Sequence, residues 1–269
     1  MVENKTKYVR SFLKWPGNKH KILGRILPHL KGDYKLIDPF LGSASIFLNT
    51  SYKRYLLADK NSDLIYLYQT LQKEGEMFIQ LCKQLFVPEN NNADCYYRLR
   101  NEFNNSRNST RKASIFLYMN RFGFNGMVRY SKKSGYNVPF GLYDRPYFPE
   151  TEMHYFYKKS KNAVFISEDF EKTLSRVRAG SDLYLDPPYF KSFAGYTENG
   201  FSIQDQERLA TKAKQLAKKG VVVVLSNHDT EYTRGIYEGA KINSFPVQRN
   251  ISCDGNNRKK AQELLAVWA

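Results

Sequence analysis

The 269-residue sequence predicts an α/β fold with a mostly parallel sheet and one large insertion. Three observations support this prediction. Short apolar runs alternate with helical patterns toward both ends of the chain, which is typical of parallel strands joined by helices. Residues 76–160 interrupt the alternation and are rich in Asn, Arg and aromatic side chains. Three predicted strands end in Asp, and a parallel sheet binds ligands beyond the carboxyl ends of its strands.

The first part of the chain contains the first set of alternating elements. Helices are predicted over residues 19–30, 44–49 and 62–72, and strands over residues 34–38 and 54–59. Asn61 can cap the helix that begins at Ser62, and Gly75 lies just past its end. These end signals fix the position of that helix in the sequence.

The alternation returns after residue 160. Strands are predicted over residues 163–167, 182–186 and 221–225, and helices over residues 170–177 and from Ser202 to Gly220. Ser202 and Asp205 have the spacing of a capping box. The last of these strands is a run of valines that ends in leucine, as in a sheet covered on both faces.

The interruption predicts two domains. The main domain comprises residues 1–60 and 161–269, and residues 61–160 form an inserted domain. A strongly apolar helix is expected near residues 113–120 of the insertion. Residues 121–149 contain glycines and prolines in turn-like settings and predict a loop-rich segment.

Charge and composition narrow the class of partner. The chain has 42 Lys and Arg against 26 Asp and Glu, a net charge of +16 that suggests a polyanion. Residues 98–133 carry nine basic side chains and one acid, and ten aromatics lie within residues 116–148, a mixture suited to phosphate contact and base stacking. The sequence has no apolar run long enough to span a bilayer, no secretory signal and no cysteine spacing typical of a zinc site. It therefore predicts a cytoplasmic chain that binds neither a membrane nor a metal.

Acidic residues at the predicted strand ends indicate a cofactor site. Asp59 follows Asp38 by 21 residues, a separation that suits hydrogen bonds to ribose hydroxyls. Gly42 permits close approach of the backbone, but its turn lacks the glycines that a pyrophosphate requires. We therefore expect a nucleoside cofactor without a pyrophosphate, and an NAD-dependent enzyme is disfavoured.

The segment Asp186-Pro187-Pro188-Tyr189 follows a predicted apolar strand. An exocyclic amine on a base is a poor nucleophile, so two acceptors must hold its N–H bonds and aim its lone pair. The Asp186 carboxylate and the Pro187 carbonyl can do so, and Tyr189 can stack on the base. The tetrapeptide predicts methylation of an amino nitrogen on a base taken out of its stack. Adenine and cytosine, and DNA and RNA, remain open at this point.

Further motifs occur in order along the chain. They are Phe12–Lys19, Asp38–Ala44, Leu57–Asn61, Asn120–Gly126, Asn137–Gly141, Ser226–Thr230 and Arg258–Lys260. With the tetrapeptide, they resemble the motifs of the Dam family of DNA adenine methyltransferases, which modify GATC, over about residues 10–268. The resemblance implies a Rossmann-like methyltransferase sheet, S-adenosylmethionine as cofactor, and double-stranded DNA as substrate. It also implies that residues 61–160 recognise the DNA target, with no obligate protein partner.

The resemblance implies a role for each matching residue. Cofactor binding falls to Trp15, Lys19, Asp38, Phe40, Gly42, Asp59 and Asp186, and catalysis to Asp186, Pro187, Pro188 and Tyr189. DNA binding falls to Lys14, Arg121, Phe124, Asn125, Met127, Arg129 and Pro139. Lys14 and Arg129 would read guanines, and Phe124 would wedge into the duplex beside Asn125. Pro139 and Met127 would contact a thymine methyl group.

The sequence departs from the family pattern at four places. Pro16-Gly17-Asn18 replaces the usual Ala-Gly-Gly or Ala-Gly-Ser, and Ala44 replaces a second loop glycine. Phe124 stands where enterobacterial relatives carry Tyr, and Leu142 where they carry a basic residue. These changes bear on affinity and site preference, not on the reaction type. A nucleic-acid-binding module with an inactive methyltransferase fold is disfavoured by the intact tetrapeptide.

Overall fold

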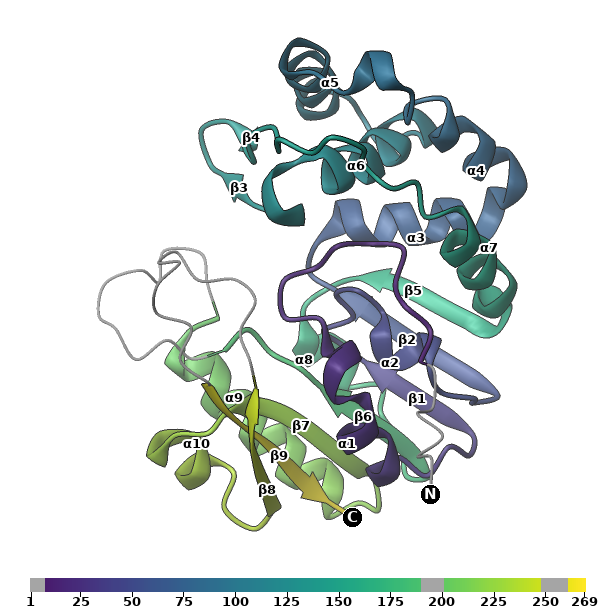
Figure 1. Ribbon diagram of the computed structural model, residues 1–269. Coiled ribbons are helices and arrows are strands. Elements are labelled where there is room, and N and C mark those ends of the chain that lie inside the picture. The colour runs from purple at the N-terminus through teal and green to yellow at the C-terminus, as the bar shows by residue number, and fades with distance from the viewer. Residues whose placement is uncertain (1–7, 190–200, 248–260) are drawn as a thin grey trace, which may run out of the picture. The chain divides into compact units, whose positions relative to one another are not determined.

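A computed structural model describes residues 8–189, 201–247 and 261–269 (Figure 1). The chain forms two compact units. Unit 1 comprises Met1–Leu23, Gly42–Thr50 and Asp59–Ser167, and unit 2 comprises Gly24–Leu41, Ser51–Ala58 and Glu168–Ala269. These units are not the two predicted domains, so the division at residues 60 and 160 stays a prediction. No helix among the described residues is long and apolar enough to cross a bilayer.

The large sheet confirms the predicted α/β class. Its strand order is β5-β2-β1-β6-β7-β9-β8. The strands are β1 (Lys35–Asp38), β2 (Arg54–Asp59), β5 (Ala163–Ser167), β6 (Ser181–Leu185), β7 (Val222–His228), β8 (Lys241–Val247) and β9 (Ala261–Trp268). β1 pairs in parallel with β2 and β6, and β6 pairs in parallel with β7. Both β2 and β5 have the predicted bounds.

The antiparallel end of the sheet is not predicted from the sequence. β9 lies between β7 and β8 and pairs antiparallel with each, with Val223 opposite Trp268 in the first pair. Leu264, Leu265 and Ala266 of β9 are almost fully buried. The C-terminal strand therefore completes the core next to β7, although it follows β7 by more than 30 residues in the sequence.

The helices of unit 2 have clear local causes. They are α8 (Phe170–Leu174), α9 (Ile203–Ala217) and α10 (Glu231–Ile236). Both halves of the predicted capping box at Ser202 and Asp205 are present at the start of α9. The helix predicted over residues 19–30 is instead three short segments: η1 (Lys19–Ile22), α1 (Leu23–Ile26) and η2 (Leu27–His29). Pro28 contributes no N–H, so a continuous helix is disfavoured there.

Unit 1 is mainly helical. Its helices are α2 (Ser45–Leu48), α3 (Ser62–Glu74), α4 (Glu76–Lys83), α5 (Ala93–Asn105), α6 (Thr110–Phe122) and α7 (Glu150–Lys159). Asn61 caps α3 as predicted, and Gly75 ends it with φ of 52°. The apolar helix α6 is buried from Ala113 to Phe122 and packs against α3, α4 and α5. The single turn η3 (Pro88–Asn90) precedes α5. After α6 come the single turn η4 (Phe124–Gly126) and the hairpin of β3 (Tyr130–Ser131) and β4 (Gly135–Tyr136), and the single turn η5 (Ser160–Asn162) follows α7.

Candidate functional site

The Asp186 carboxylate is held in place at the carboxyl end of β6. All five residues of β6 are buried, and Asp186 directly follows them, half-buried. Its Oδ1 accepts a hydrogen bond from Ser226 Oγ at 2.9 Å, and Ser226 Oγ lies 3.0 Å from the Tyr184 hydroxyl. Burial, followed by the negative charge of Asp186, raises the pKa of Tyr184, which therefore stays protonated. One oxygen of the carboxylate is thus fixed from within unit 2.

The two prolines and Tyr189 continue from this point. Pro187 is buried, whereas Pro188 is exposed and its carbonyl accepts a hydrogen bond from Gln206 Nε2 at 2.8 Å. The Tyr189 ring lies edge-on to His228, with 4.4 Å between ring centroids. Burial and the nearby charge of Asp186 raise the pKa of Tyr189, so its ring stays neutral. A neutral aromatic ring is suited to stacking on a base.

Asp38 and Phe40 form the turn after β1. Asp38 is only 2% exposed, and its Oδ1 accepts the Phe40 N–H at 3.0 Å. The Phe40 ring stacks on Phe170 at 5.6 Å and meets Phe201 edge-on at 5.6 Å. Because β1 and β6 pair in parallel, Asp38 at the end of β1 and Asp186 just after β6 lie at the same edge of the sheet. The Asp38 side chain holds the turn after β1 through its hydrogen bond to the Phe40 N–H.

In unit 1, the Asp59 carboxylate connects the turn after β2 to the loop that contains Gly42. Asp59 Oδ2 accepts the Gly42 N–H at 3.0 Å, and Asp59 Oδ1 accepts the Asn61 N–H at 2.9 Å. Burial raises the pKa of Asp59, while these backbone N–H groups act in the opposite direction. Each carboxylate oxygen can accept a further hydrogen bond, because it has two lone pairs. The side chain is thus oriented and can still accept from a ligand.

Trp15 lies directly over Gly42. A Cβ atom at Gly42, where φ is +45°, would come within 2.9 Å of Trp15 Nε1. The glycine therefore allows the indole to lie close to the loop. Lys19 is 6% exposed, and its Nζ donates to the Gly17 carbonyl at 3.1 Å. Trp15, Lys19, Gly42 and Asp59 accordingly belong to one unit, whereas Asp38, Phe40 and Asp186 belong to the other.

Two segments of unit 1 present the residues predicted to contact DNA. Phe124 N–H donates to the Pro139 carbonyl at 2.9 Å, so the segments that contain them run side by side. Phe124 is 49% exposed, and Pro139 is also exposed, while Met127 is half-buried. Asn125 is exposed with φ of 53°, and its N–H donates to the Tyr143 hydroxyl at 2.8 Å. A large apolar ring thus protrudes from a hydrogen-bonded frame.

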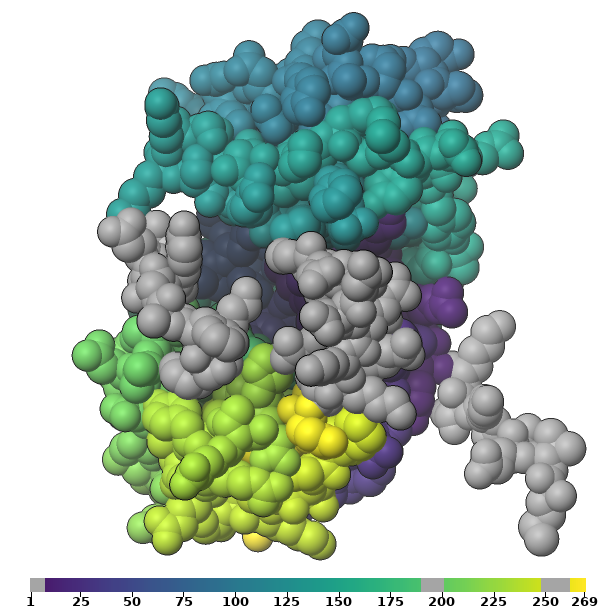
Figure 2. Space-filling view, turned by 60° about the vertical axis from the view of Figure 1, so that its left-hand side comes forward, coloured from purple at the N-terminus to yellow at the C-terminus, as the bar shows by residue number. Residues whose placement is uncertain are grey.

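Arg129 is exposed but oriented. Its Nε donates to Asn137 Oδ1 at 2.7 Å, and its Nη2 donates to the Asn137 carbonyl at 3.1 Å. The Asn137 N–H in turn donates to the Arg129 carbonyl at 3.0 Å. The remaining Nη1–Nη2 edge of the guanidinium is suited to recognition of a paired acceptor. Figure 2 shows the helical part of unit 1 in blue and teal.

Lys14 is clamped by a residue that sequence reasoning did not assign a role. The fully buried Asn120 accepts the Lys14 N–H at 2.9 Å and donates to the Lys14 carbonyl at 2.7 Å. Lys14 Nζ lies 3.9 Å from the Tyr143 ring centroid and 3.4 Å from the Arg121 carbonyl oxygen. Burial and the Arg121 charge lower the pKa of Lys14 to about 8. Asn120 belongs to the Asn120–Gly126 motif, but the sequence does not show that its side chain is buried.

Arg121 differs from the other predicted DNA contacts because it is buried. It is 9% exposed, and its Nε donates to the Tyr147 carbonyl at 3.0 Å. Burial lowers its pKa. This placement favours a role in holding the loop that contains Tyr147, and the contact of Arg121 with DNA stays a prediction.

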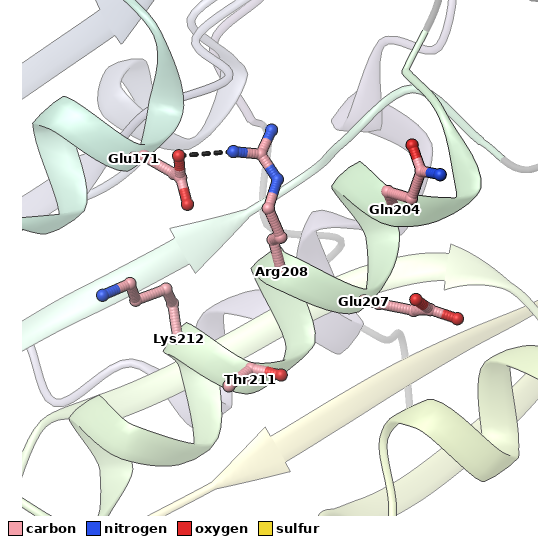
Figure 3. A pocket seen from close by; sticks show the side chains of 6 residues that line it. All are labelled: Glu171, Gln204, Glu207, Arg208, Thr211 and Lys212. Atoms are coloured by element: carbon pink, nitrogen blue, oxygen red, sulfur yellow. Dashed lines mark hydrogen bonds and ion pairs between the residues drawn. The ribbon is translucent and has the colours of Figure 1, made fainter.

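A polar hollow on the outer side of α9 contains none of the predicted site residues. Its lining residues are Glu171, Gln204, Glu207, Arg208, Thr211 and Lys212 (Figure 3). Arg208 forms ion pairs with Glu171 and Asp205 across it. Acidic and basic side chains therefore neutralise one another in this hollow, and it offers no set of groups for the predicted chemistry.

The fold and the tetrapeptide together define a methyltransferase that acts on an amino nitrogen. Comparison with known proteins identifies the target base. Residues 15–251 match the family of D12 class N6 adenine-specific DNA methyltransferases. The chain belongs to this family and methylates adenine in DNA, which confirms the predicted resemblance.

Curated relatives match over nearly the whole chain. A DNA adenine methylase from Vibrio cholerae is 46% identical over 265 residues, which cover 96% of each chain. A DNA adenine methylase from Escherichia coli K12 is 44% identical over 264 residues, which cover 96% of this chain and 95% of the relative. A DNA adenine methylase from Serratia marcescens is 44% identical over 265 residues, which cover 96% of this chain and 98% of the relative.

Proposed function

We propose that this adenine methyltransferase takes its methyl group from S-adenosylmethionine and acts on an adenine extruded from double-stranded DNA, within GATC. The product would be S-adenosylhomocysteine, and no metal takes part. The observation that carries this proposal is the Asp186 carboxylate, fixed by Ser226 and followed by two prolines and an aromatic ring. An extruded base can reach such a site, whereas a stacked base cannot.

The chemistry needs two hydrogen-bond acceptors. We assign one N6–H bond to the Asp186 carboxylate and the other to the Pro187 carbonyl, so that the nitrogen lone pair points away from both. The bound cofactor supplies an electrophilic methyl group on a sulfonium centre. The N6–methyl bond would form as the methyl–sulfur bond breaks, and the Asp186 carboxylate would stabilise the positive charge that develops on N6. N6 would then lose one proton to the Asp186 carboxylate that already accepts its N–H bond, and solvent would take up that proton. Tyr189 would hold the base by stacking on its face.

The residues that the sequence predicts for cofactor binding are assigned to S-adenosylmethionine. The Asp59 carboxylate is oriented by two backbone N–H groups and suits the ribose hydroxyls. Trp15 offers an aromatic surface over Gly42, and Lys19 belongs to the same unit. Asp38 and Phe40 would shape the site from the turn after β1. This donor and acceptor set fits a nucleoside and contains no glycine-rich loop for a pyrophosphate.

Residues 61–160 are proposed to recognise the DNA target. Arg129 would read guanine, since two hydrogen bonds to Asn137 fix the orientation of its guanidinium. Phe124 would wedge into the duplex, because its ring is exposed and its backbone is tied to Pro139. Pro139 and Met127 would lie near a thymine methyl group, with Asn125 beside the wedge. Lys14 would read a second guanine from outside the inserted domain.

Methyl incorporation into a panel of duplexes tests the proposed function. We expect tritiated S-adenosylmethionine to label adenine in a GATC duplex. Each single-position change in GATC should lower the rate of incorporation by about 10-fold or more, as expected for one lost base contact. Equal labelling of duplexes that lack GATC would contradict the proposed specificity, and labelling of cytosine would contradict the proposed chemistry.

The lowered pKa of Lys14 predicts a dependence of DNA affinity on pH. Below about 8 the Lys14 ammonium is charged and makes charge-assisted hydrogen bonds to guanine; above that pH the unbound protein holds a neutral amine. We expect the dissociation constant for a GATC duplex to rise by up to about 10-fold per pH unit above about 8. Fluorescence anisotropy with S-adenosylhomocysteine present measures it.

The matched variant for this test is Lys14→Arg. A guanidinium stays charged throughout this pH range, so the variant should lose the rise in dissociation constant above about pH 8. The same pH dependence in wild type and variant would show that another group titrates. A dissociation constant for wild type that does not change up to about pH 9.5 would contradict the role of Lys14 in binding.

A further inference from the structure

The Pro187-Pro188 turn cannot be held through donors of its own, because proline has no backbone N–H. The carbonyl groups are therefore the only backbone groups through which the two prolines can form hydrogen bonds. We propose that Gln206 and Asn227 are positioning residues that hold this turn so that the Pro187 carbonyl meets the adenine N6 amine. The inference rests on the proposed function, since it concerns the second acceptor of the same reaction. All of the residues involved belong to unit 2.

Gln206 makes the contact to the turn. It lies in the first turn of α9, whose start is fixed by the capping box, and its side chain is fully buried. Its Nε2 donates to the Pro188 carbonyl at 2.8 Å. A buried polar side chain on an otherwise apolar helix face costs stability unless it is hydrogen-bonded, so its presence calls for a reason.

Asn227 and Tyr237 fix the orientation of the Gln206 amide. Asn227 Nδ2 donates to Gln206 Oε1 at 3.1 Å and to the Tyr237 hydroxyl at 2.7 Å. The Tyr237 hydroxyl lies 3.4 Å from Gln206 Oε1. Asn227 and Tyr237 are both fully buried. Because Asn227 and Tyr237 both offer donors, the Gln206 amide oxygen faces them and its N–H₂ group faces the Pro188 carbonyl. The flipped amide would place its oxygen against the Pro188 carbonyl oxygen, which cannot donate.

The same segment of β7 supports both acceptors. Successive side chains of a strand point to opposite faces. Ser226 donates to Asp186 Oδ1, whereas Asn227 acts through Gln206 on the Pro188 carbonyl. β7 is apolar from Val222 to Leu225 and becomes polar only at this pair, where it reaches the level of the tetrapeptide. One dipeptide thus orients the carboxylate directly and the proline turn indirectly.

Gln206→Met is the variant that tests this role. It keeps the length of the side chain and removes the donor, so the turn loses its hydrogen bond. We expect single-turnover methyl transfer to slow by about 10–100-fold, because a displacement of about 1 Å at a reacting group costs this much. Dissociation constants for DNA and for S-adenosylmethionine should change by less than about 3-fold. These quantities do not depend on the alignment of N6.

Gln72→Met is the matched control. Gln72 also donates through its Nε2 to backbone carbonyls, those of Ser160 and of Ala163 at 2.9 Å, but in unit 1 and outside the assigned sites. Both variants should lower the melting temperature, and only Gln206→Met should slow methyl transfer. Equal single-turnover rates for Gln206→Met and wild type would overturn the inference, and so would an equal slowing in the two variants.

Two further measurements separate positioning from loss of structure. Fluorescence of 2-aminopurine at the target position should be unchanged in Gln206→Met, because that base lacks an amino group at C6 and its extrusion does not require the aligned carbonyl. In Gln206→Glu the new carboxyl can donate to Pro188 only when protonated. Its rate relative to wild type should therefore rise as the pH falls, and a constant ratio would overturn the inference. A wild-type protein without adenine methylation would instead overturn the proposed function.

Discussion

Asp186→Ala is expected to lower single-turnover methyl transfer by at least about 1,000-fold. The variant loses the acceptor that aligns one N6–H bond and the negative charge that stabilises the nitrogen as it becomes positive. Loss of an electrostatic group of this kind lowers the rate by about 10²–10³-fold, and loss of alignment lowers it further. Dissociation constants for a GATC duplex should stay within about 3-fold of wild type, because the predicted DNA contacts lie in unit 1. Rapid-quench assays and anisotropy measure the two quantities.

Two further variants make this result specific. Asp186→Asn keeps one neutral acceptor and should retain more activity than Asp186→Ala, because the alignment survives in part while the charge does not. Asp33→Ala changes an exposed aspartate of the same unit and should leave the rate of methyl transfer unchanged. Turnover by Asp186→Ala within about 10-fold of wild type would show that another group holds the amine.

The parts of the fold that the sequence predicts well are those with local causes. β2 and β5 have the predicted bounds because each is a short apolar run between polar turns. α3 and α9 begin where Asn61 and Ser202 accept hydrogen bonds from the first turn of the helix. The tetrapeptide is found directly after β6, since the paired prolines end the strand.

What the sequence does not predict depends on partners far along the chain. β9 is a strand because it pairs with β7 and β8, whereas an isolated apolar run of its length also fits a helix. Arg121 is buried and its Nε donates to the carbonyl of Tyr147, 26 residues away, a contact that the sequence does not show. No sequence motif links Gln206 to Asn227, although Asn227 lies in the Ser226–Thr230 motif. Their relation to the tetrapeptide exists only once α9 packs on β7.

Two aspartates with different roles, Asp182 and Asp186, lie at opposite ends of strand β6. Asp182 lies near its amino end and Asp186 follows its carboxyl end, four residues later. Asp182 is 4% exposed, and its Oδ2 accepts the Lys31 N–H at 2.6 Å and the Gly32 N–H at 3.2 Å, together with the Tyr52 hydroxyl. Burial and the hydrogen bond to Asp182 raise the pKa of Tyr52, so its hydroxyl stays a donor. Asp182 thus ties three segments of unit 2 together.

Asp182→Ala should therefore reduce the free energy of unfolding without changing the chemistry. It leaves two backbone N–H groups and one hydroxyl without their buried acceptor, which corresponds to a loss of about 3–5 kcal/mol in urea denaturation. Tyr52→Phe removes only one of these donors and should cost about 1 kcal/mol. Single-turnover methyl transfer per folded molecule should stay within about 3-fold of wild type in both variants, because the opposite end of β6 holds Asp186. A decrease in the free energy of unfolding below about 1 kcal/mol for Asp182→Ala would show that solvent replaces the carboxylate at this end of the strand. A large decrease in the rate of methyl transfer would show that the two ends of β6 are coupled.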